Sequence, residues 1–511
     1  MGLKTFTTNF LGAAPQWYKN TIVAFLVLNP ILWWSASLAP FLEGSFLEVV
    51  FANMHTVAGW ALVLQFIFTL AMALRCYPLQ PGGLLAIEAI ALGMTNTKHV
   101  YQEIVVGFPV ILLLLFMVTA IFFMRELLLF IFTKLLVRVR SQILLAFLFS
   151  SVAAVLSAFL DALTVTAVVI SVGLGFWHVY NEVAEADRSF EDDAAKLKHE
   201  QELEKYRAFL RGLLMHAAVG TAIGGVMTTV GEPQNLLISK VMGWDFIEFF
   251  LRMAIVTLPV MVVGFCTCVF LELTGWFHYG AKLPNSIREI LQDYENQEDK
   301  KRTTAEKAQL VVQAIAAILL VFALAFHIAE VGIVGLMIIV IQTAFNGIVD
   351  EHRIADGFGE ALPFISLLVV FFAIVAVIHD QHLFAPVVNW VLTLEPSQQP
   401  GMFYIANGLL SAISDNVFVA TVYITEIETA FESGTIDRHL FDTLAIAVNT
   451  GTNIPSVLTP NGQAAFLFLL TTSLAPLIRL SYLRMVKMAF PYFVTMGLMG
   501  WIMVTFFLYS G

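Results

Sequence analysis

The sequence has few charged residues and few cysteines, and both shortages exclude classes of protein. Only 13% of its 511 residues are charged, while 59% are hydrophobic and the mean hydropathy is +0.82. A water-soluble fold cannot bury that share of apolar surface, so we exclude this class. The three cysteines, Cys76, Cys266 and Cys268, form neither a zinc-binding pattern nor a disulfide framework.

Motifs for catalysis and for nucleic-acid binding are missing as well. The chain has no Gly-Lys dipeptide and hence no Walker A loop, which argues against an ATP-driven pump. It also lacks the His-Glu-x-x-His pattern of zinc hydrolases. The net charge of −11 is not accompanied by any basic stripe. We therefore expect a protein that is not an enzyme, carries no cofactor and binds no nucleic acid.

Long apolar runs dominate what is present. Residues 105–123 and 314–326 are apolar over most or all of the ~20 residues that a membrane-spanning helix needs. A β-barrel would show short alternating segments instead. The sequence therefore predicts an all-α polytopic membrane protein embedded in a lipid bilayer. We predict spans near residues 20–41, 51–76, 83–104, 105–134, 246–275, 307–328, 331–349, 361–394 and 487–510.

Two apolar segments, residues 142–177 and 401–425, each hold a lone aspartate. Asp161 and Asp415 both end the pattern Ser-Ala-x-x-Asp, which begins at Ser157 in the first segment and at Ser411 in the second. A carboxylate at membrane depth costs free energy, so a function is the default expectation for it. We expect both segments to be re-entrant helical hairpins.

Each predicted hairpin is followed by a helix-breaking polar segment. Glycine and proline interrupt the predicted spans at 207–241 and 440–470, and such breaks free carbonyl oxygens that suit Na⁺. Simple kinks would show the same composition, but two matched breaks behind two matched aspartates favour an ion site. The residues predicted to bind Na⁺ and H⁺ are Asp161, Asp415, Thr164, Asn416, Thr228, Thr229, Glu232, Asn235, Asn453, Ser456, Thr459 and Asn461.

The order of these segments predicts two inverted repeats. Residues 51–275 and 307–511 each give three spans, a hairpin and an interrupted helix. An odd number of crossings per half reverses the orientation of the second copy, as in many secondary transporters. Residues 1–50 form an N-terminal segment with one extra span, and residues 276–306 form a charged loop between the halves.

Charged residues predict the orientation of the chain. Basic residues flank the first hairpin, whereas acidic residues flank the second. The positive-inside rule then places the first hairpin on the cytoplasmic side, the N-terminus in the cytoplasm and the C-terminus in the periplasm. The basic residues are Lys134, Arg138, Arg140, Arg188, Lys196, Lys198, Lys205 and Arg207.

A few titratable residues lie in apolar surroundings away from these motifs. For His216 a hydrogen-bonded structural role is favoured over a pH-sensing role. Asp380, which lies between two histidines, is interpreted as part of a polar turn at the end of a span. Glu272 is interpreted as an interfacial carboxylate, and none of the three is predicted to bind the transported ion.

The two breaks read Gly231-Glu232-Pro233-Gln234-Asn235 and Thr459-Pro460-Asn461-Gly462. With the aspartate-bearing hairpins, they resemble the ion transporter superfamily, which includes the divalent anion:sodium symporters and the arsenite pumps. The whole chain is similar to the bacterial NhaB-type sodium/proton antiporters. This resemblance implies a multi-pass protein of the bacterial inner membrane that exports Na⁺ or Li⁺ in exchange for protons, as a homodimer with an elevator-like motion.

The hairpin tips depart from the symporter pattern. Symporters of this superfamily carry Ser-Asn-Thr at the tip, whereas this chain has Asp161 and Asp415 there. Two carboxylates favour cation exchange because they repel anionic substrates. The alternative is a sodium-coupled symporter of an organic or inorganic anion within the same superfamily.

Overall fold

The computed structural model describes residues 9–42, 46–186 and 193–508, and these form helices and loops without a strand. Nine described helices are long and apolar enough to cross a membrane, so the predicted all-α polytopic fold is confirmed. The nine are Gln16–Phe41, Met54–Ala71, Gln142–Phe159, Ala162–Asn181, Glu200–Gly225, Phe246–Thr274, Thr304–Ala325, Glu351–Asp380 and Tyr482–Phe507.

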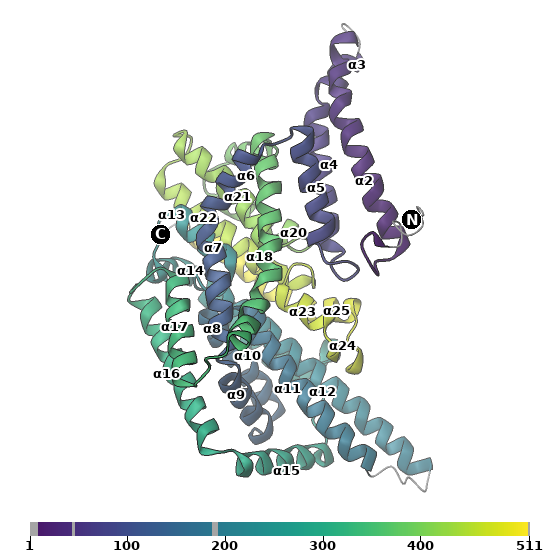
Figure 1. Ribbon diagram of the computed structural model, residues 1–511, viewed down its shortest axis with the longest axis vertical. Helices are drawn as coiled ribbons and strands as arrows, with labels where there is room; N and C mark the ends of the chain where they lie inside the picture. Colours follow the sequence, from purple (N-terminus) through teal and green to yellow (C-terminus); the bar gives the residue numbers. More distant parts are fainter. Residues whose placement is uncertain (1–8, 43–45, 187–192, 509–511) are drawn as a thin grey trace.

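The N-terminal helices stand at one side of the molecule (Figure 1). They are α2 (Gln16–Ser35), its 3₁₀ continuation η1 (Ala36–Leu42), α3 (Phe46–Ala52), α4 (Met54–Ala71) and α5 (Leu79–Leu92). The predicted spans 20–41 and 51–76 correspond to α2 with η1 and to α4.

The predicted span 83–104 is wrong as a single helix. Gly93 adopts a left-handed conformation with φ of 81°, which ends α5. The side chain of Asn96 then accepts a hydrogen bond from the backbone N–H of His99 and starts α6 (Thr97–Val106).

A sharp bend follows at Gly107. Helix α6 and the segment made of α7 (Phe108–Leu113), η2 (Leu114–Val118) and α8 (Thr119–Phe122) meet at 57°. A Cβ atom on Gly107 would overlap the ring of Phe372, so glycine is required at this close contact. The predicted span 105–134 is therefore also wrong as one helix, because the chain breaks again before α9 (Arg125–Arg138).

The first aspartate segment forms two helices, α10 (Gln142–Phe159) and α11 (Ala162–Ala186), joined at Leu160 and Asp161. The predicted interrupted span is found as α12 (Asp193–Gly225) and α13 (Pro233–Met242). Gly220 and Gly224 lie on α12 where it contacts the backbone of α10, and a Cβ atom at either position would overlap that backbone. Then come α14 (Phe246–Thr274), η3 (Trp276–His278) and α15 (Asn285–Lys301).

The rest of the described chain is also helical. Its helices are α16 (Thr304–Ala325), α17 (Val331–Phe345), α18 (Glu351–Asp380), α19 (Ala385–Leu392), α20 (Gln399–Ser411), α21 (Asn416–Glu432), α22 (Arg438–Asn453), η4 (Pro455–Leu458), α23 (Ala464–Thr471), α24 (Leu474–Leu477), α25 (Tyr482–Ile502) and η5 (Met503–Phe507). The predicted span 361–394 is wrong as one helix, because α18 ends at Asp380 and His382 has a positive φ of 50°.

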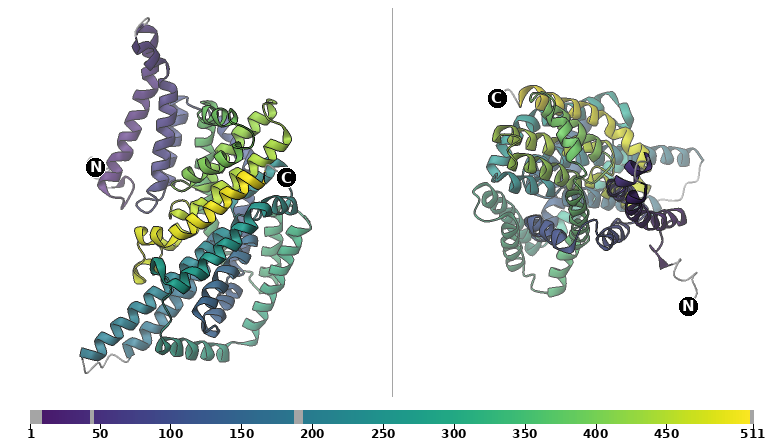
Figure 2. Two further views of the ribbon diagram at one scale, coloured as in Figure 1. Left: turned by 180° about the vertical axis from the view of Figure 1, so that it is seen from behind. Right: turned by 90° about the horizontal axis from the view of Figure 1, so that it is seen from above.

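The long helices α11 and α12 project beyond the rest of the molecule at one end (Figure 2). At that end α15 runs across the ends of other helices (Figure 1). Lys134 on α9 forms ion pairs with Glu295 and Asp299, which fix α15 there. The hydrogen bond from Lys134 lowers the pKa of the Asp299 carboxyl.

The division into repeats and the membrane depth of the hairpins remain predictions. The arms α10 and α11 of the first hairpin are both long enough to cross a membrane, whereas α20 and α21 of the second have 13 and 17 residues. Residues 1–8 and 509–511 lie outside the described part, so the predicted orientation of the termini remains a prediction. Arg188 and the side chains of Lys196 and Lys198 lie outside it as well.

Candidate ion-binding site

Each aspartate ends a hairpin tip and starts the second arm. An oxygen of Asp161 accepts a hydrogen bond from the backbone N–H of Thr164, at 3.2 Å. Asp415 accepts hydrogen bonds from the N–H groups of Val417 and Phe418, at 2.8 and 3.3 Å. Both carboxylates therefore lie at the positive ends of helices α11 and α21, which stabilises their negative charge.

Each break is held against its hairpin by a threonine. The hydroxyl of Thr228 donates to the carbonyl of Ala158, and the hydroxyl of Thr459 donates to the carbonyl of Ala412 at 2.5 Å. Thr228 and Thr459 were predicted as ion ligands, and the structure shows their hydroxyl protons donated to the hairpin backbone.

A glycine lies three residues after each of these threonines. The N–H of Gly231 points to the Thr228 hydroxyl at 3.3 Å, and the N–H of Gly462 points to the Thr459 hydroxyl at the same distance. A Cβ atom would come within 2.7 Å of the Ser157 carbonyl oxygen at the first glycine. At the second it would come within 2.5 Å of the corresponding oxygen of Ser411, so both breaks need glycine.

A buried amide network joins the two breaks. The side chain of Gln234 donates to the side-chain oxygen of Asn453 at 2.6 Å, and Asn453 donates to the side-chain oxygen of Asn235 at 3.2 Å. Asn235 in turn donates to the carbonyls of Gly225 and Thr228, at 2.7 and 2.6 Å. Helix α13 is thereby attached to the end of α22, which brings the two halves of the chain together.

The tip of the second hairpin has its own polar contacts. Ser411 donates to the side-chain oxygen of Asn416, whose amide lies 3.4 Å from the hydroxyl of Ser456. Ser456 donates to the carbonyl of Asn453 at 2.6 Å. Asn416 and Ser456 are therefore fixed by protein contacts before any ion arrives.

A small cavity of about 20 Å³ lies where the two breaks meet. That volume holds roughly one water-sized particle. Four of the predicted residues line it, and three of the four are acids from different segments of the chain. The four are Asp161, Glu232, Asp415 and Asn416.

Glu232 leaves a hydrogen-bonding group unused beside this cavity. It is only 5% exposed, and its Oε1 atom has no hydrogen-bond partner among the described residues. The side-chain oxygens of Thr229 and Gln234 are also buried without a partner in that part of the chain. Buried polar atoms normally have partners, so these atoms are suited to a bound water or ion.

The three acids do not by themselves form a metal-binding site. Within residues 9–42, 46–186 and 193–508, no three His, Cys, Asp or Glu side chains are grouped closely enough to hold a metal ion. An ion in the small cavity would therefore need amide or carbonyl oxygens in addition to carboxylates, as the polar composition of the breaks allows.

The structure places the remaining predicted residues around the cavity rather than on it. Thr164 lines a wider neighbouring cavity. Asn461 points away, because its amide donates to the carbonyl of Ala71 at 3.2 Å and lies 3.4 Å from the Tyr482 hydroxyl. Hydrogen bonds within the protein hold five others at the breaks, namely Thr228, Asn235, Asn453, Ser456 and Thr459. Thr229 is buried, and its hydroxyl has no partner among the described residues.

Seven of the eleven residues that line the small cavity were not predicted as site residues, and two of these seven are informative. Gln234 lies inside the first break, between Pro233 and Asn235, and its position there was a usable signal. Phe364 reaches the cavity from α18, and no motif marks it.

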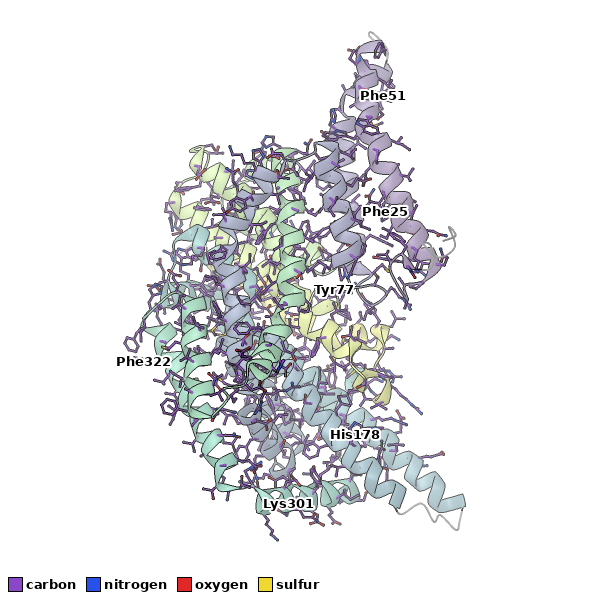
Figure 3. The ribbon with its side chains drawn as sticks, in the orientation of Figure 1. Phe25, Phe51, Tyr77, His178, Lys301 and Phe322 are labelled. Carbon is purple, nitrogen blue, oxygen red and sulfur yellow. The ribbon has the colours of Figure 1, made fainter. Side chains whose placement is uncertain are left out.

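A wider cavity of about 430 Å³ continues from the small one. The two share Asp161, Leu163 and Phe364, and the wider cavity also reaches Arg125 and Glu360. Tyr77, labelled in Figure 3, borders it and donates its hydroxyl to the Pro363 carbonyl at 2.7 Å. Asp161 therefore borders both the small cavity and a wide approach to it, whereas Asp415 borders the small one alone among the cavities described.

Further cavities continue from the wider one toward α15. A third cavity of about 510 Å³ shares Phe122 and Arg125 with the wider one. A fourth, of about 450 Å³, shares Glu126 with the third and extends to Lys301 on α15, labelled at the lower edge of Figure 3. The successive cavities therefore lead from Asp161 toward the end of the molecule that carries α15.

Comparisons with known proteins point to one family. The family described as "NhaB: Bacterial Na+/H+ antiporter B (NhaB)" matches residues 1–510. A protein of Saccharophagus degradans named "Na(+)/H(+) antiporter NhaB" is 59% identical over 502 residues, which cover 97% of each chain. Proteins with the same name from Hahella chejuensis and from Pseudomonas fluorescens strain Pf-5 are each 58% identical, over 98% and 99% of both chains.

Proposed function

The chain belongs to the NhaB family of bacterial Na⁺/H⁺ antiporters, and on that premise we propose that it exchanges Na⁺ for H⁺ across the bacterial inner membrane. The small cavity between the two breaks is the proposed exchange site. The observation that carries this assignment is the meeting of Asp161, Glu232 and Asp415 around a space for about one water-sized particle. Membership of an antiporter family also supports a transporter rather than an enzyme.

The charge of the cavity favours a cation. Its described lining includes three acids and no lysine, arginine or histidine. A bound cation stabilises a buried carboxylate in its charged form, while loss of the cation and of water favours the protonated form. Na⁺ and H⁺ can therefore compete for the same side chains, and an organic anion would be repelled by them.

The chain of cavities supplies access from one side. It leads from Asp161 toward α15, close to the basic residues Lys134 and Arg138 of α9. The positive-inside rule assigns that side to the cytoplasm, with the N-terminus cytoplasmic and the C-terminus periplasmic. Na⁺ would enter from the cytoplasm by this route and leave on the other side after a rearrangement.

Alternating access completes the proposal. Paired breaks of this kind occur in transporters whose halves move against each other around a fixed site. Resemblance to the superfamily supports an elevator-like motion within a homodimer, with Li⁺ as a second substrate. We assign Asp161, Asp415 and Glu232 to Na⁺ and H⁺, and Asn416 and Gln234 to positioning the ion.

Transport by purified protein in liposomes tests the function. With a proton gradient imposed, we expect uptake of labelled Na⁺ that collapses when a protonophore removes the gradient. Labelled succinate supplied with Na⁺ should stay outside, because the cavity is acidic. The double variant Asp161→Asn/Asp415→Asn should give background uptake. Asp293→Asn, an exposed aspartate on α15, serves as the matched control with unchanged uptake.

Two results would overturn the proposal. One is Na⁺-dependent succinate uptake that ignores the proton gradient, which would favour the anion symporter. The other is full Na⁺/H⁺ exchange by the double aspartate variant, which would place the ion elsewhere.

A further inference from the structure

A further cavity lies away from the proposed ion route. Its volume is about 700 Å³, and it lies between the loop before α10, the end of α14 and the start of α15. It shares no lining residue with the small cavity or with the 430 Å³ cavity. The proposed ion exchange does not use it, so its side chains are free to serve a separate role.

Three basic side chains line this cavity: Arg140, Lys282 and Arg288. None of them forms an ion pair with any residue of the described chain. Arg140 and Arg288 line the same cavity, so positive charges are crowded here. Burial, and second the nearby charge of Arg140, lower the pKa of the Arg288 guanidinium, which also donates a hydrogen bond to the Val139 carbonyl at 3.2 Å. The first turn of α10 also borders the cavity and adds the positive end of its helix dipole. An anion would relieve this crowding.

Two acids line the other part of the same cavity. Glu289 is exposed on α15 and forms no ion pair within the described chain. Glu272 has a side chain only 1% exposed, and its Oε1 atom lies 2.9 Å from the His216 ring. Its second oxygen, Oε2, is buried without a partner among the described residues. Glu272 is thus enclosed in the protein behind the cavity wall, which leaves Glu289 as the acid that a ligand can contact.

Exposed apolar side chains lie beside the cavity. Leu273, which lines the cavity, is 66% exposed, and nearby Phe270 and Trp276 are 48% and 60% exposed. Aromatic side chains concentrate at the membrane–water interface, where α14 ends. An apolar stripe continues along α14 toward its other end, formed by Leu251, Ile255, Leu258 and Val262, all exposed.

We propose that this cavity binds a phospholipid whose headgroup carries both a phosphate and an amine. Arg140, Lys282 and Arg288 hold the phosphate, since basic pockets between helices suit lipid headgroups. The exposed Glu289 holds the ammonium group, and the acyl chains follow the apolar stripe of α14. A free phosphate ester would gain nothing from that stripe, so we assign the site to a lipid.

Native mass spectrometry of the purified full-length protein tests this proposal. The probes are phosphatidylethanolamine, phosphatidylglycerol and phosphatidylcholine with identical acyl chains. We expect phosphatidylethanolamine to bind most tightly, since phosphatidylglycerol has no amine and the choline methyl groups block hydrogen bonds to carboxylates. Equal binding of phosphatidylglycerol and phosphatidylethanolamine would overturn the assignment of Glu289 to an ammonium group.

Charge variants separate the two parts of the site. Arg140→Gln/Arg288→Gln should weaken phosphatidylethanolamine binding by about tenfold or more. Lys300→Gln/Lys307→Gln removes two exposed charges outside the cavity and should leave binding unchanged. Glu289→Gln should reduce the preference for phosphatidylethanolamine over phosphatidylglycerol. Unchanged binding by the arginine variant would refute the site.

Two controls test the folding of the variants and the identity of the ligand. Na⁺/H⁺ exchange by each variant in liposomes shows that the protein is folded. Because Lys282 is exposed, Lys282→Gln is a second variant that tests phosphate binding with little risk to folding. Soluble glycerophosphoethanolamine is the competing probe. If it displaced the lipid at equal concentration, the site would belong to a soluble phosphate ester and the lipid assignment would be wrong.

Discussion

The two breaks share their backbone contacts and differ in the residue that follows the glycine. Thr228 and Thr459 donate to the carbonyls of their hairpins in the same way, and each is followed by a glycine three residues later. After that glycine, the first break has Glu232 and the second has Gln463. The same local geometry therefore carries an extra acid in the first half only.

At the hairpin tips, the additional polar residue is in the second half instead of the first. After Asp415 comes Asn416, which contacts Ser411 and Ser456. After Asp161 comes Ala162, which offers no such contact, and Asp161 borders the wide approach to the cavity. Under the proposed function, the first half would therefore receive the ion and the second half would provide a fixed polar wall.

The largest expected effect comes from replacing each aspartate with asparagine in a separate variant. Asp161→Asn should reduce Na⁺-driven proton flux in vesicles to background, because Asp161 lies at both the approach and the site. Asp415→Asn should reduce it by about tenfold or more, as loss of a supporting site group does. Initial rates over a range of Na⁺ concentrations measure both, with Asp293→Asn as control. A larger loss in Asp415→Asn than in Asp161→Asn would reverse the comparison.

Moving the acidic side chain from the first break to the second should have a smaller effect on transport. Glu232→Gln makes the first break resemble the second, and should weaken the apparent Na⁺ affinity by about tenfold. Adding Gln463→Glu should not restore it, because the Gln463 side chain does not line the small cavity within the described chain. The measurement is the Na⁺ concentration at half-maximal flux. Recovery in the double variant would show that the two breaks are interchangeable.

The aspartates and breaks could be predicted because polar residues, glycine and proline are conspicuous in apolar runs. Which of them face the cavity could not be predicted, because that depends on how α13 meets α22. Asn235 and Asn453 have the same side chain as Asn461, yet the first two bond across the breaks and the third contacts Ala71.

Two of the three span predictions that failed did so for a related reason. The chain stays apolar across the points where α5 and α18 end. The hydropathy of residues 83–104 and 361–394 therefore did not reveal the positive φ angles of Gly93 and His382. Gly93 was a usable signal, since glycine commonly ends a helix in that conformation. His382 was a weaker signal, because positive φ angles are uncommon in residues other than glycine, although histidine adopts them more often than most.

The smallest expected effect concerns the threonines that both halves share. Thr228→Val and Thr459→Val keep the side-chain shape and remove the hydroxyl, leaving the carbonyl of Ala158 or Ala412 without that donor. Each change should destabilise the protein by about 1 kcal/mol, the usual value of one such hydrogen bond. Thermal unfolding in detergent should show similar losses, and Thr228→Ser and Thr459→Ser should retain stability.

The same variants distinguish a supporting role from an ion-binding role. If the threonines only hold the breaks, the apparent Na⁺ affinity should change little in either valine variant. A clear loss of Na⁺ affinity in Thr228→Val alone, with the stability losses still equal, would make Thr228 an ion ligand. The first half would then supply a hydroxyl oxygen as well as Asp161 and Glu232, and the difference between the halves would be larger than the cavity lining indicates.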